Sequence, residues 1–383
     1  MSDDRTLIES PDRLAELAGE LARVPRLAVD TEANGFHAYR PRLCLVQLAW
    51  EQGDEIRVAL VDPLALRQDL GPLADVFADP RIEKVLHGAD YDVRLLARDA
   101  GATIAGLFDT DIAARMVGWS RTGLSALAER ILGRSLPKGA QRLDWARRPL
   151  PARALAYAAD DVRVLLPIRD HLVAELERLG RRHWAEQAFR ALERVRAAEE
   201  DDGAIDVDAL LSRARGAGRL DPPARARLGE VLSWRETLAR RLDRPAAFVA
   251  PTGPLVEAAR RDVRDLDGLV RAGLPRRVVD RHGKAILAAL DRGRRRPPRP
   301  LPRGRGEGPM SAEAAARLER LRRARAEAAA RLELDPGLVC PSSLLKEIAR
   351  TAPRSRDELV QAGLADWQVE ALGDRLLRAV SGG

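Results

Sequence analysis

Short apolar runs bounded by polar residues recur through the first half of the chain, and runs of this length predict strands. They occupy residues 27–32, 43–50, 56–61 and 84–87. The second and third runs are joined by the polar turn Gln52-Gly53-Asp54. We therefore expect the first three strands to form an antiparallel meander.

Helical periodicity fills the segments between and after these runs. Ser10-Pro11 is a typical helix start, an N-cap residue followed by proline at the first helical position. Further helices are expected at about 64–77, 90–98, 109–118, 124–132 and 153–179. Pro167 should kink or break the last of them. Strands followed by alternating strands and helices predict an α/β domain, with a mixed sheet and helices packed on it, over residues 1–200.

The second half of the chain is helical and repeats itself. Residues 248–251 match 338–341, and residues 269–274 match 359–364, with the same offset of ninety positions in both pairs. Two copies are too few for a solenoid. The repeat therefore predicts two small all-α domains, at 219–292 and 310–383.

Two linkers are expected around these helical domains. Residues 201–218 have thin apolar periodicity and gather acids and glycines, so they are predicted to connect the α/β domain to the first helical one. A second linker is expected at 293–309. Within it and just before it, residues 292–305 hold seven arginines, four prolines and no acid. This composition is typical of a semi-rigid linker, and its charge is also compatible with contacts to a phosphate backbone.

Composition narrows the class of protein. The 383 residues are too many for one ordinary core, and 45% hydrophobic content is ample for several domains. The formal net charge of +7 favours a polyanionic partner. Cys44 and Cys340 have no metal-ligand spacing and suit a reducing compartment. With no signal-peptide pattern at the N-terminus and no apolar run of bilayer length, a cytoplasmic location is expected.

The run at residues 27–32 ends in an unusual way, because Asp30 and Glu32 follow apolar residues directly. Alternate side chains of a strand share a face, so these two carboxylates should point the same way. Burying an unpaired carboxylate is costly, and a divalent cation would offset the charge. A strand end with a solvated Asp-Thr-Glu turn is the alternative reading of the same residues.

A second acidic segment, residues 87–92, lies at a predicted strand-to-helix junction, where ligands of α/β folds often gather. It offers two acids, Asp90 and Asp92, and the chemistry alone does not choose between them. An N-cap role would explain Asp90.

A third segment, residues 157–161, carries Tyr157 with Asp160 and Asp161 on a predicted helix. The four-residue spacing puts Tyr157 and Asp161 on one helix face. By itself this pattern is more typical of a surface helix pair, and either acid is chemically acceptable.

Taken in order, the segments 30–32, 87–92 and 157–161 resemble the three exonuclease motifs of the DEDD superfamily, in its tyrosine-bearing branch. Residues 144–150 are similar to the stretch before the third motif in ribonuclease D. The helical repeats resemble tandem HRDC (helicase-and-RNase-D C-terminal) modules. This resemblance covers nearly the whole chain. It implies a ribonuclease H-like mixed sheet flanked by helices, followed by two small helical bundles.

The resemblance also implies an activity, the hydrolysis of RNA phosphodiester bonds from the 3′ end with two divalent cations, Mg²⁺ or Mn²⁺. Two such ions can activate a water and stabilise the leaving oxygen, and both prefer oxygen ligands. The family intervals favour the second acid of each pair. The implied metal ligands are Asp30, Glu32, Asp92 and Asp161. Tyr157 would orient the attacking water, because a phenol with its usual pKa is a poor general base.

The implied partner is RNA with a free 3′ end, with transfer-RNA precursors as the family substrate. Two weaker candidates for substrate contacts are Phe36, by stacking on a base, and His87, near the scissile phosphate. Loop packing and a structural histidine are the competing readings. A DNA 3′-5′ exonuclease and a catalytically inactive nucleic-acid-binding scaffold are the alternative functions. The intact motif set argues against the scaffold.

Overall fold

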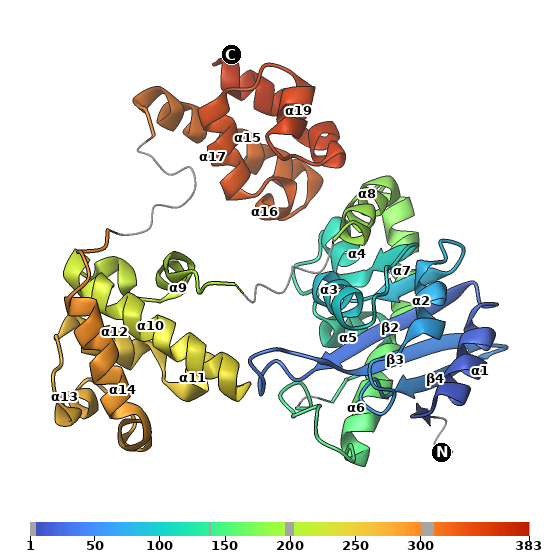
Figure 1. Cartoon of the computed structure of the whole chain (residues 1–383). Coiled ribbons are helices and arrows are strands. Elements are labelled where there is room, and N and C mark those ends of the chain that lie inside the picture. The colour runs from blue at the N-terminus through green and yellow to red at the C-terminus, as the bar shows by residue number, and fades with distance from the viewer. Residues whose placement is uncertain (1–4, 138, 196–202, 301–309, 383) are drawn as a thin grey trace. The chain divides into compact units, whose positions relative to one another are not determined.

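The computed structural model describes residues 5–137, 139–195, 203–300 and 310–382 (Figure 1). It divides into two compact units. The first consists of residues 1–33, 42–198 and 309–383, and the second of residues 34–41 and 199–308. Their buried residues fall into separate hydrophobic clusters, so each unit is stabilised by burial within itself.

A six-stranded mixed sheet organises the first unit, in the order β1-β4-β3-β2-β5-β6. The strands are β1 (Arg5–Ile8), β2 (Arg26–Ala33), β3 (Leu43–Gln52), β4 (Glu55–Val61), β5 (Glu83–Leu86) and β6 (Leu107–Asp109). Strands β2, β3 and β4 form the predicted antiparallel meander. The short outer strands β1 and β6 were not expected, and both pair parallel with their neighbours. The predicted mixed sheet is confirmed.

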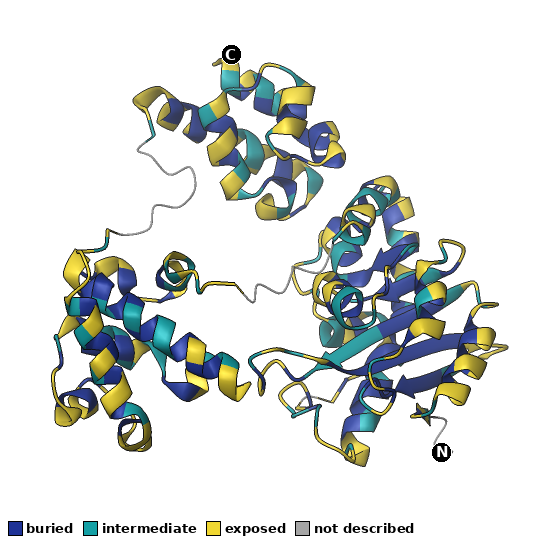
Figure 2. Ribbon diagram, viewed as in Figure 1, coloured by how far each residue is buried: buried dark blue, intermediate teal, exposed yellow. Residues whose placement is uncertain are grey.

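Helices cover both faces of this sheet, which explains why the first eight residues of β3 are all buried (Figure 2). Helices α1 (Pro11–Leu21), α2 (Gly71–Ala78) and α3 (Asp90–Asp99) share one cluster with the sheet. The opposite face is covered by α4 (Thr110–Val117), α5 (Leu124–Leu132), α6 (Ala152–Arg163), α7 (Leu165–Arg178) and α8 (Arg182–Glu193). We call the described residues 5–33 and 42–195 the sheet domain.

Two predicted helices of the sheet domain have different bounds in the structure. The helix expected at 64–77 begins only at Gly71, because Arg67 and Gln68 adopt positive φ in a series of turns. The helix expected at 153–179 is two helices, with the break at Val164 rather than at Pro167. Pro167 lies in the first turn of α7, where a missing backbone N–H removes no helical hydrogen bond.

The second unit is helical. Its elements are α9 (Val207–Arg213), the short 3₁₀ helix η1 (Ala217–Arg219), α10 (Pro222–Leu242), α11 (Ala246–Val249), α12 (Thr252–Arg260), α13 (Leu266–Arg271) and α14 (Arg276–Arg294). The linker predicted at 201–218 is wrong from residue 207 onward. Leu211, Ala214 and Ala217 are buried in the same cluster as α10. These few apolar residues are enough to join the helical core, although their sparse pattern suggested a linker. Residues 201 and 202 lie outside the described residues.

A second helical domain ends the chain and repeats the first. Its helices are α15 (Ala312–Leu332), α16 (Pro336–Val339), α17 (Ser342–Thr351), α18 (Arg356–Gln361) and α19 (Asp366–Ser381). Each begins ninety positions after its counterpart among α10 to α14. The predicted repeat is therefore a repeat of structure. Of the arginine-rich linker, residues 301–309 lie outside the described range, and Arg299 forms an ion pair with Asp208 at 2.9 Å.

In the ranges that the structure describes, no helix is both long enough and apolar enough to cross a bilayer.

Candidate active site

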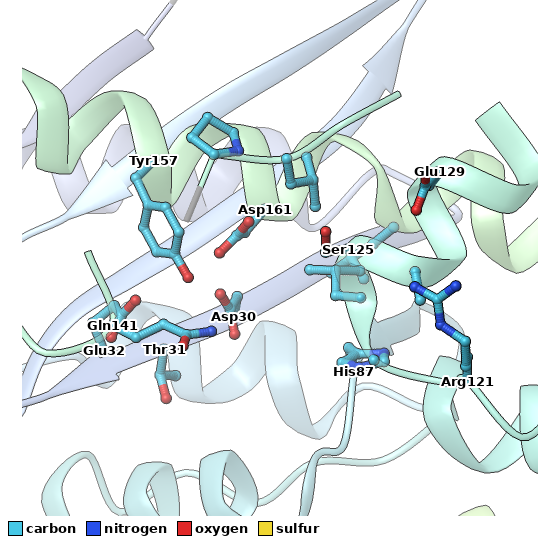
Figure 3. Close-up of a pocket in the computed structure, with 16 residues that line it drawn as sticks. Asp30, Thr31, Glu32, His87, Arg121, Ser125, Glu129, Gln141, Tyr157 and Asp161 are labelled. Atoms are coloured by element: carbon cyan, nitrogen blue, oxygen red, sulfur yellow. The ribbon is translucent and has the colours of Figure 1, made fainter. Parts of the chain in front are cut away.

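Strand β2 carries the first acidic segment into a cavity of about 630 Å³ (Figure 3). Asp30 and Glu32 lie on the same face of β2, as the alternation of a strand requires. Helix α6 crosses that face and presents Tyr157 and Asp161, one turn apart. In Figure 3 the carboxylates of Asp30 and Asp161 point toward each other, and the Tyr157 ring reaches from the helix toward them. The structure thus brings together residues more than a hundred positions apart in the sequence.

Asp92 approaches the other acids from α3, where it contacts Thr31 of β2. It lies in the first turn of α3, is 8% exposed, and does not line the cavity. The Thr31 hydroxyl, from the other face of β2, donates a hydrogen bond to the Asp92 carboxylate. The negative charge of Asp92 is one of the causes that raise the pKa of Asp30 and of Glu32. Asp92 therefore belongs electrostatically to the same cluster as the cavity acids.

The four carboxylates are held in a setting that disfavours their charge. Burial, and then the neighbouring carboxylates, raise the pKa of Glu32 to about 8 and that of Asp30 well above its ordinary value. Burial likewise raises the pKa of Asp92 to about 7 and the pKa of Asp161 to about 6. Four acids packed together without an opposing positive charge form a site that a cation would stabilise.

Tyr157 lies one turn before Asp161 on α6, and each side chain shifts the pKa of the other. Burial, followed by the charge of Asp161, raises the pKa of Tyr157, so the phenol stays protonated at neutral pH. The oxygen of a protonated phenol keeps lone pairs that can accept a hydrogen bond from water. Trp145, fully buried, packs its ring 6.5 Å from the Tyr157 ring and limits the positions that ring can take.

The structure also separates the competing acids. Asp90 is exposed and forms an ion pair with Arg94 at 3.0 Å, away from the cavity. It is not the N-cap of α3, a position that Ala89 occupies, so that expectation was wrong. Asp160 forms an ion pair with Arg134 at 3.2 Å. The acids that join the cluster are therefore the second of each pair, as the family intervals implied.

The two weaker candidates differ in their placement. His87 lines the cavity, and its Nδ1 lies 2.9 Å from the Thr110 hydroxyl. Phe36 is 59% exposed and does not line the cavity. It belongs to the segment 34–41, which groups with the second unit, where Arg240 Nε donates to the Tyr39 hydroxyl at 3.0 Å.

Several cavity residues were not anticipated from the sequence. Arg121 and Ser125 lie at the end of the cavity near His87, and Gln141 lies beside Glu32 (Figure 3). Arg121 comes from the loop before α5, Ser125 from the first turn of α5, and Gln141 from the loop after it, and none of these segments carries a motif. Only the folding of these segments over β2 reveals them.

The residues present fit a hard divalent cation by their chemistry, because the clustered side chains offer carboxylate oxygens, the donors that Mg²⁺ and Mn²⁺ prefer. Within the described ranges, no three His, Cys, Asp or Glu side chains stand close enough together to enclose an ion. The carboxylates therefore suit a divalent cation by their donor atoms and their charge. To coordinate one, their side chains would have to move closer together than they stand in this structure.

Comparison with known families agrees with this site. Residues 6–177 match a 3′-5′ exonuclease model, and residues 224–290 and 314–380 each match an HRDC domain. The exonuclease match contains the whole carboxylate cluster, and the two HRDC matches fall within the helical repeats. The family match therefore assigns the sheet domain, with the acids on β2 and the tyrosine and acid on α6, to the class of 3′-5′ exonucleases.

Individual relatives narrow the class further. The ribonuclease D of Xanthomonas oryzae pv. oryzae is 38% identical over 265 residues, which are 69% of each chain. That of Pseudomonas paraeruginosa is 31% identical over 380 residues, 96% of this chain and 95% of the relative. The structure of Escherichia coli RNase D, an exoribonuclease involved in structured RNA processing, matches with a TM-score of 0.72, at 25% identity and over 99% of both chains. The chain belongs to the ribonuclease D family and is a 3′-5′ exoribonuclease of the divalent-metal-dependent type.

Proposed function

We propose that this protein trims structured RNA, transfer-RNA precursors among them, from a free 3′ end with two divalent cations. Asp30, Glu32, Asp92 and Asp161 would hold the ions, and Tyr157 would orient the attacking water. The observation that supports this assignment is the cluster of four carboxylates whose pKa values are all raised by burial.

When bound, the ions supply the activation of water at neutral pH and the stabilisation of charge on the leaving oxygen. The protein's own residues do the rest. The Tyr157 phenol, protonated at neutral pH, would accept a hydrogen bond from the attacking water through its oxygen and so orient that water. Thr31 holds Asp92 in one orientation through its hydrogen bond.

The substrate class follows from charge and from the relatives. The chain has a formal net charge of +7, and Escherichia coli RNase D, which it matches over 99% of its length, is involved in structured RNA processing. Arg121, exposed at one end of the cavity, is a cation in reach of a phosphate that enters there. Arginine binds phosphate through paired N–H groups, so it suits the nucleotide next to the scissile bond.

The test uses the full chain on matched RNA and DNA oligonucleotides labelled at the 5′ end, with Mg²⁺ or Mn²⁺. We expect a ladder of products shortened from the 3′ end of RNA, and none in EDTA. Asp30→Asn should remove the activity. Asp90→Asn is the matched control, because Asp90 is exposed and outside the cluster.

Either of two results would contradict the proposal. Preferred degradation of the DNA oligonucleotide would favour the DNA exonuclease alternative. Equal loss in Asp90→Asn and Asp30→Asn would mean that the carboxylate cluster is not the metal site.

A further inference from the structure

Gln47 lies on β3, directly opposite Asp30 in the register of the β2–β3 pair. Residues opposite each other in an antiparallel pair point to the same face, so Gln47 faces α6 as Asp30 does. Its neighbours on that face of β3, Leu45 and Ala49, are buried in the cluster that contains α6. The Gln47 side chain is fully buried.

Neither the amide nitrogen nor the amide oxygen of Gln47 has a hydrogen-bond partner among the described residues. Buried polar side chains are normally paired, and leaving one unpaired is costly. Of the sheet-domain side chains in the unpaired set, Gln47 has both of its polar atoms unpaired, whereas Gln68, Trp145, Trp184 and Gln187 each have one. The equally buried Lys84 donates to the carbonyl oxygens of Asp79 and Ile82, at 2.5 and 2.6 Å. Leaving both polar atoms of Gln47 unpaired in the core therefore costs the metal-free fold stability.

The charged group that the strand register places nearest to this amide is the Asp30 carboxylate. Side chains directly opposite on antiparallel strands have Cβ atoms about 4.5–5.5 Å apart, so a glutamine amide can reach a carboxylate across the pair. Carboxylates that bind metals are commonly held by a hydrogen bond from an outer partner. An amide suits this task, because it donates a hydrogen bond without adding a charge that repels or competes for the cation.

We propose that Gln47 is a positioning residue for Asp30: when a divalent cation is bound, the Nε2–H group of Gln47, unpaired in this structure, would donate to the Asp30 carboxylate and hold it in the orientation that binds the cation. This inference rests on the proposed metal site. It adds a residue that no exonuclease motif contains and that does not line the cavity.

The test is the affinity of the full chain for Mn²⁺ without RNA, measured by titration calorimetry, beside the melting temperature in EDTA. Gln47→Met keeps the length of the side chain and removes the amide. We expect the Mn²⁺ dissociation constant to rise about tenfold, the lower end of the loss seen for outer partners of metal ligands. The metal-free melting temperature should stay the same or rise, because two unpaired polar atoms leave the core. Excess Mn²⁺ should restore kcat.

Leu48→Met is the matched control. Leu48 is the next residue of β3, is equally buried, and packs in the cluster on the opposite face of the sheet. It tests whether a change of packing in this strand is enough to weaken metal binding, and we expect unchanged affinity. Gln47→Leu gives the same measurement should the methionine variant fail to fold.

The outcomes separate this inference from the proposed function. A lower metal-free melting temperature with unchanged Mn²⁺ affinity in Gln47→Met would overturn it and make Gln47 a structural residue. If Asp30→Asn loses Mn²⁺ affinity while Gln47→Met does not, only the positioning role fails. If Asp30→Asn keeps full affinity, the metal site itself is wrong.

Discussion

The sheet domain surrounds two sets of acids in opposite ways, one fully buried and one at the cavity. Asp62 and Asp109, both 1% exposed, have their charges met by the fold. Arg148 donates from Nε and Nη2 to the two carboxylate oxygens of Asp62, at 2.5 and 2.6 Å. Asp109 accepts four backbone N–H groups, from Gly88, Ala89, Asp111 and Ile112.

The acids of the cluster receive much less. Asp92 accepts a hydrogen bond from the Thr31 hydroxyl, which is a neutral donor. Asp30 and Glu32 face the other carboxylates, and the pKa of each is raised. The same domain that gives Asp62 and Asp109 so many donors leaves the carboxylates of the cluster to repel one another. The difference indicates that their charge is kept for a ligand, and that the metal-free protein gives up stability for it.

The largest expected effect is that of Asp30→Asn. The substitution keeps the volume and removes one charge from the cluster, so RNA hydrolysis should fall by about 10³-fold or more at saturating Mg²⁺, a loss of at least about 4 kcal/mol in transition-state stabilisation. Single-turnover kinetics measure the loss, and circular dichroism checks the fold. Full activity of this variant with excess Mg²⁺ would contradict the conclusion that the unpaired acids of the cluster bind the metal.

Tyr157→Phe comes next. Only the hydroxyl is removed, so metal and RNA should still bind while the attacking water loses its orientation. We expect kcat to fall about 10²- to 10³-fold with little change in KM, the scale of losing one catalytic contact. A change confined to KM would instead assign Tyr157 to substrate binding.

Arg148→Met tests the acids whose charges are paired, because Arg148 is the cation that pairs with Asp62. It leaves Asp62 buried without its cation, and it should lower the free energy of unfolding by roughly 2 kcal/mol, less than the 3–5 of a fully buried pair because Arg148 is 27% exposed. Urea denaturation in EDTA measures it. The same experiment on Asp30→Asn should show no loss. Similar losses in both variants would remove the distinction between satisfied and unsatisfied acids.

The smallest effect is a pH dependence of the metal-free protein. Acids whose pKa is raised in the folded state bind more protons folded than unfolded between about pH 4 and pH 8. Stability in EDTA should therefore fall as the pH rises through this range, by a few degrees in melting temperature. In Asp30→Asn the fall should be shallower. A melting temperature that rises from pH 5 to pH 8 in EDTA would contradict the repulsion argued here.

Much of the fold could be predicted because it follows local rules. The helix Leu124–Leu132 was expected with its observed bounds, since Gly133 ends it in the left-handed conformation. The alternation of β2 put Asp30 and Glu32 on one face before any partner was known. The ninety-residue repeat became a repeat of helices because similar apolar patterns bury similar cores.

The sequence by itself thus determined the four inner strands, most helices and the identity of the acidic segments, all of which depend on residues a few positions apart. Only the tertiary structure decided which acids meet. Asp92 differs from Asp90 by its place on the buried side of α3, toward Thr31. The unpaired amide of Gln47 became visible only when β3 was aligned beside β2 and covered by α6. Such facts depend on register and on packing between distant segments, which no local pattern encodes.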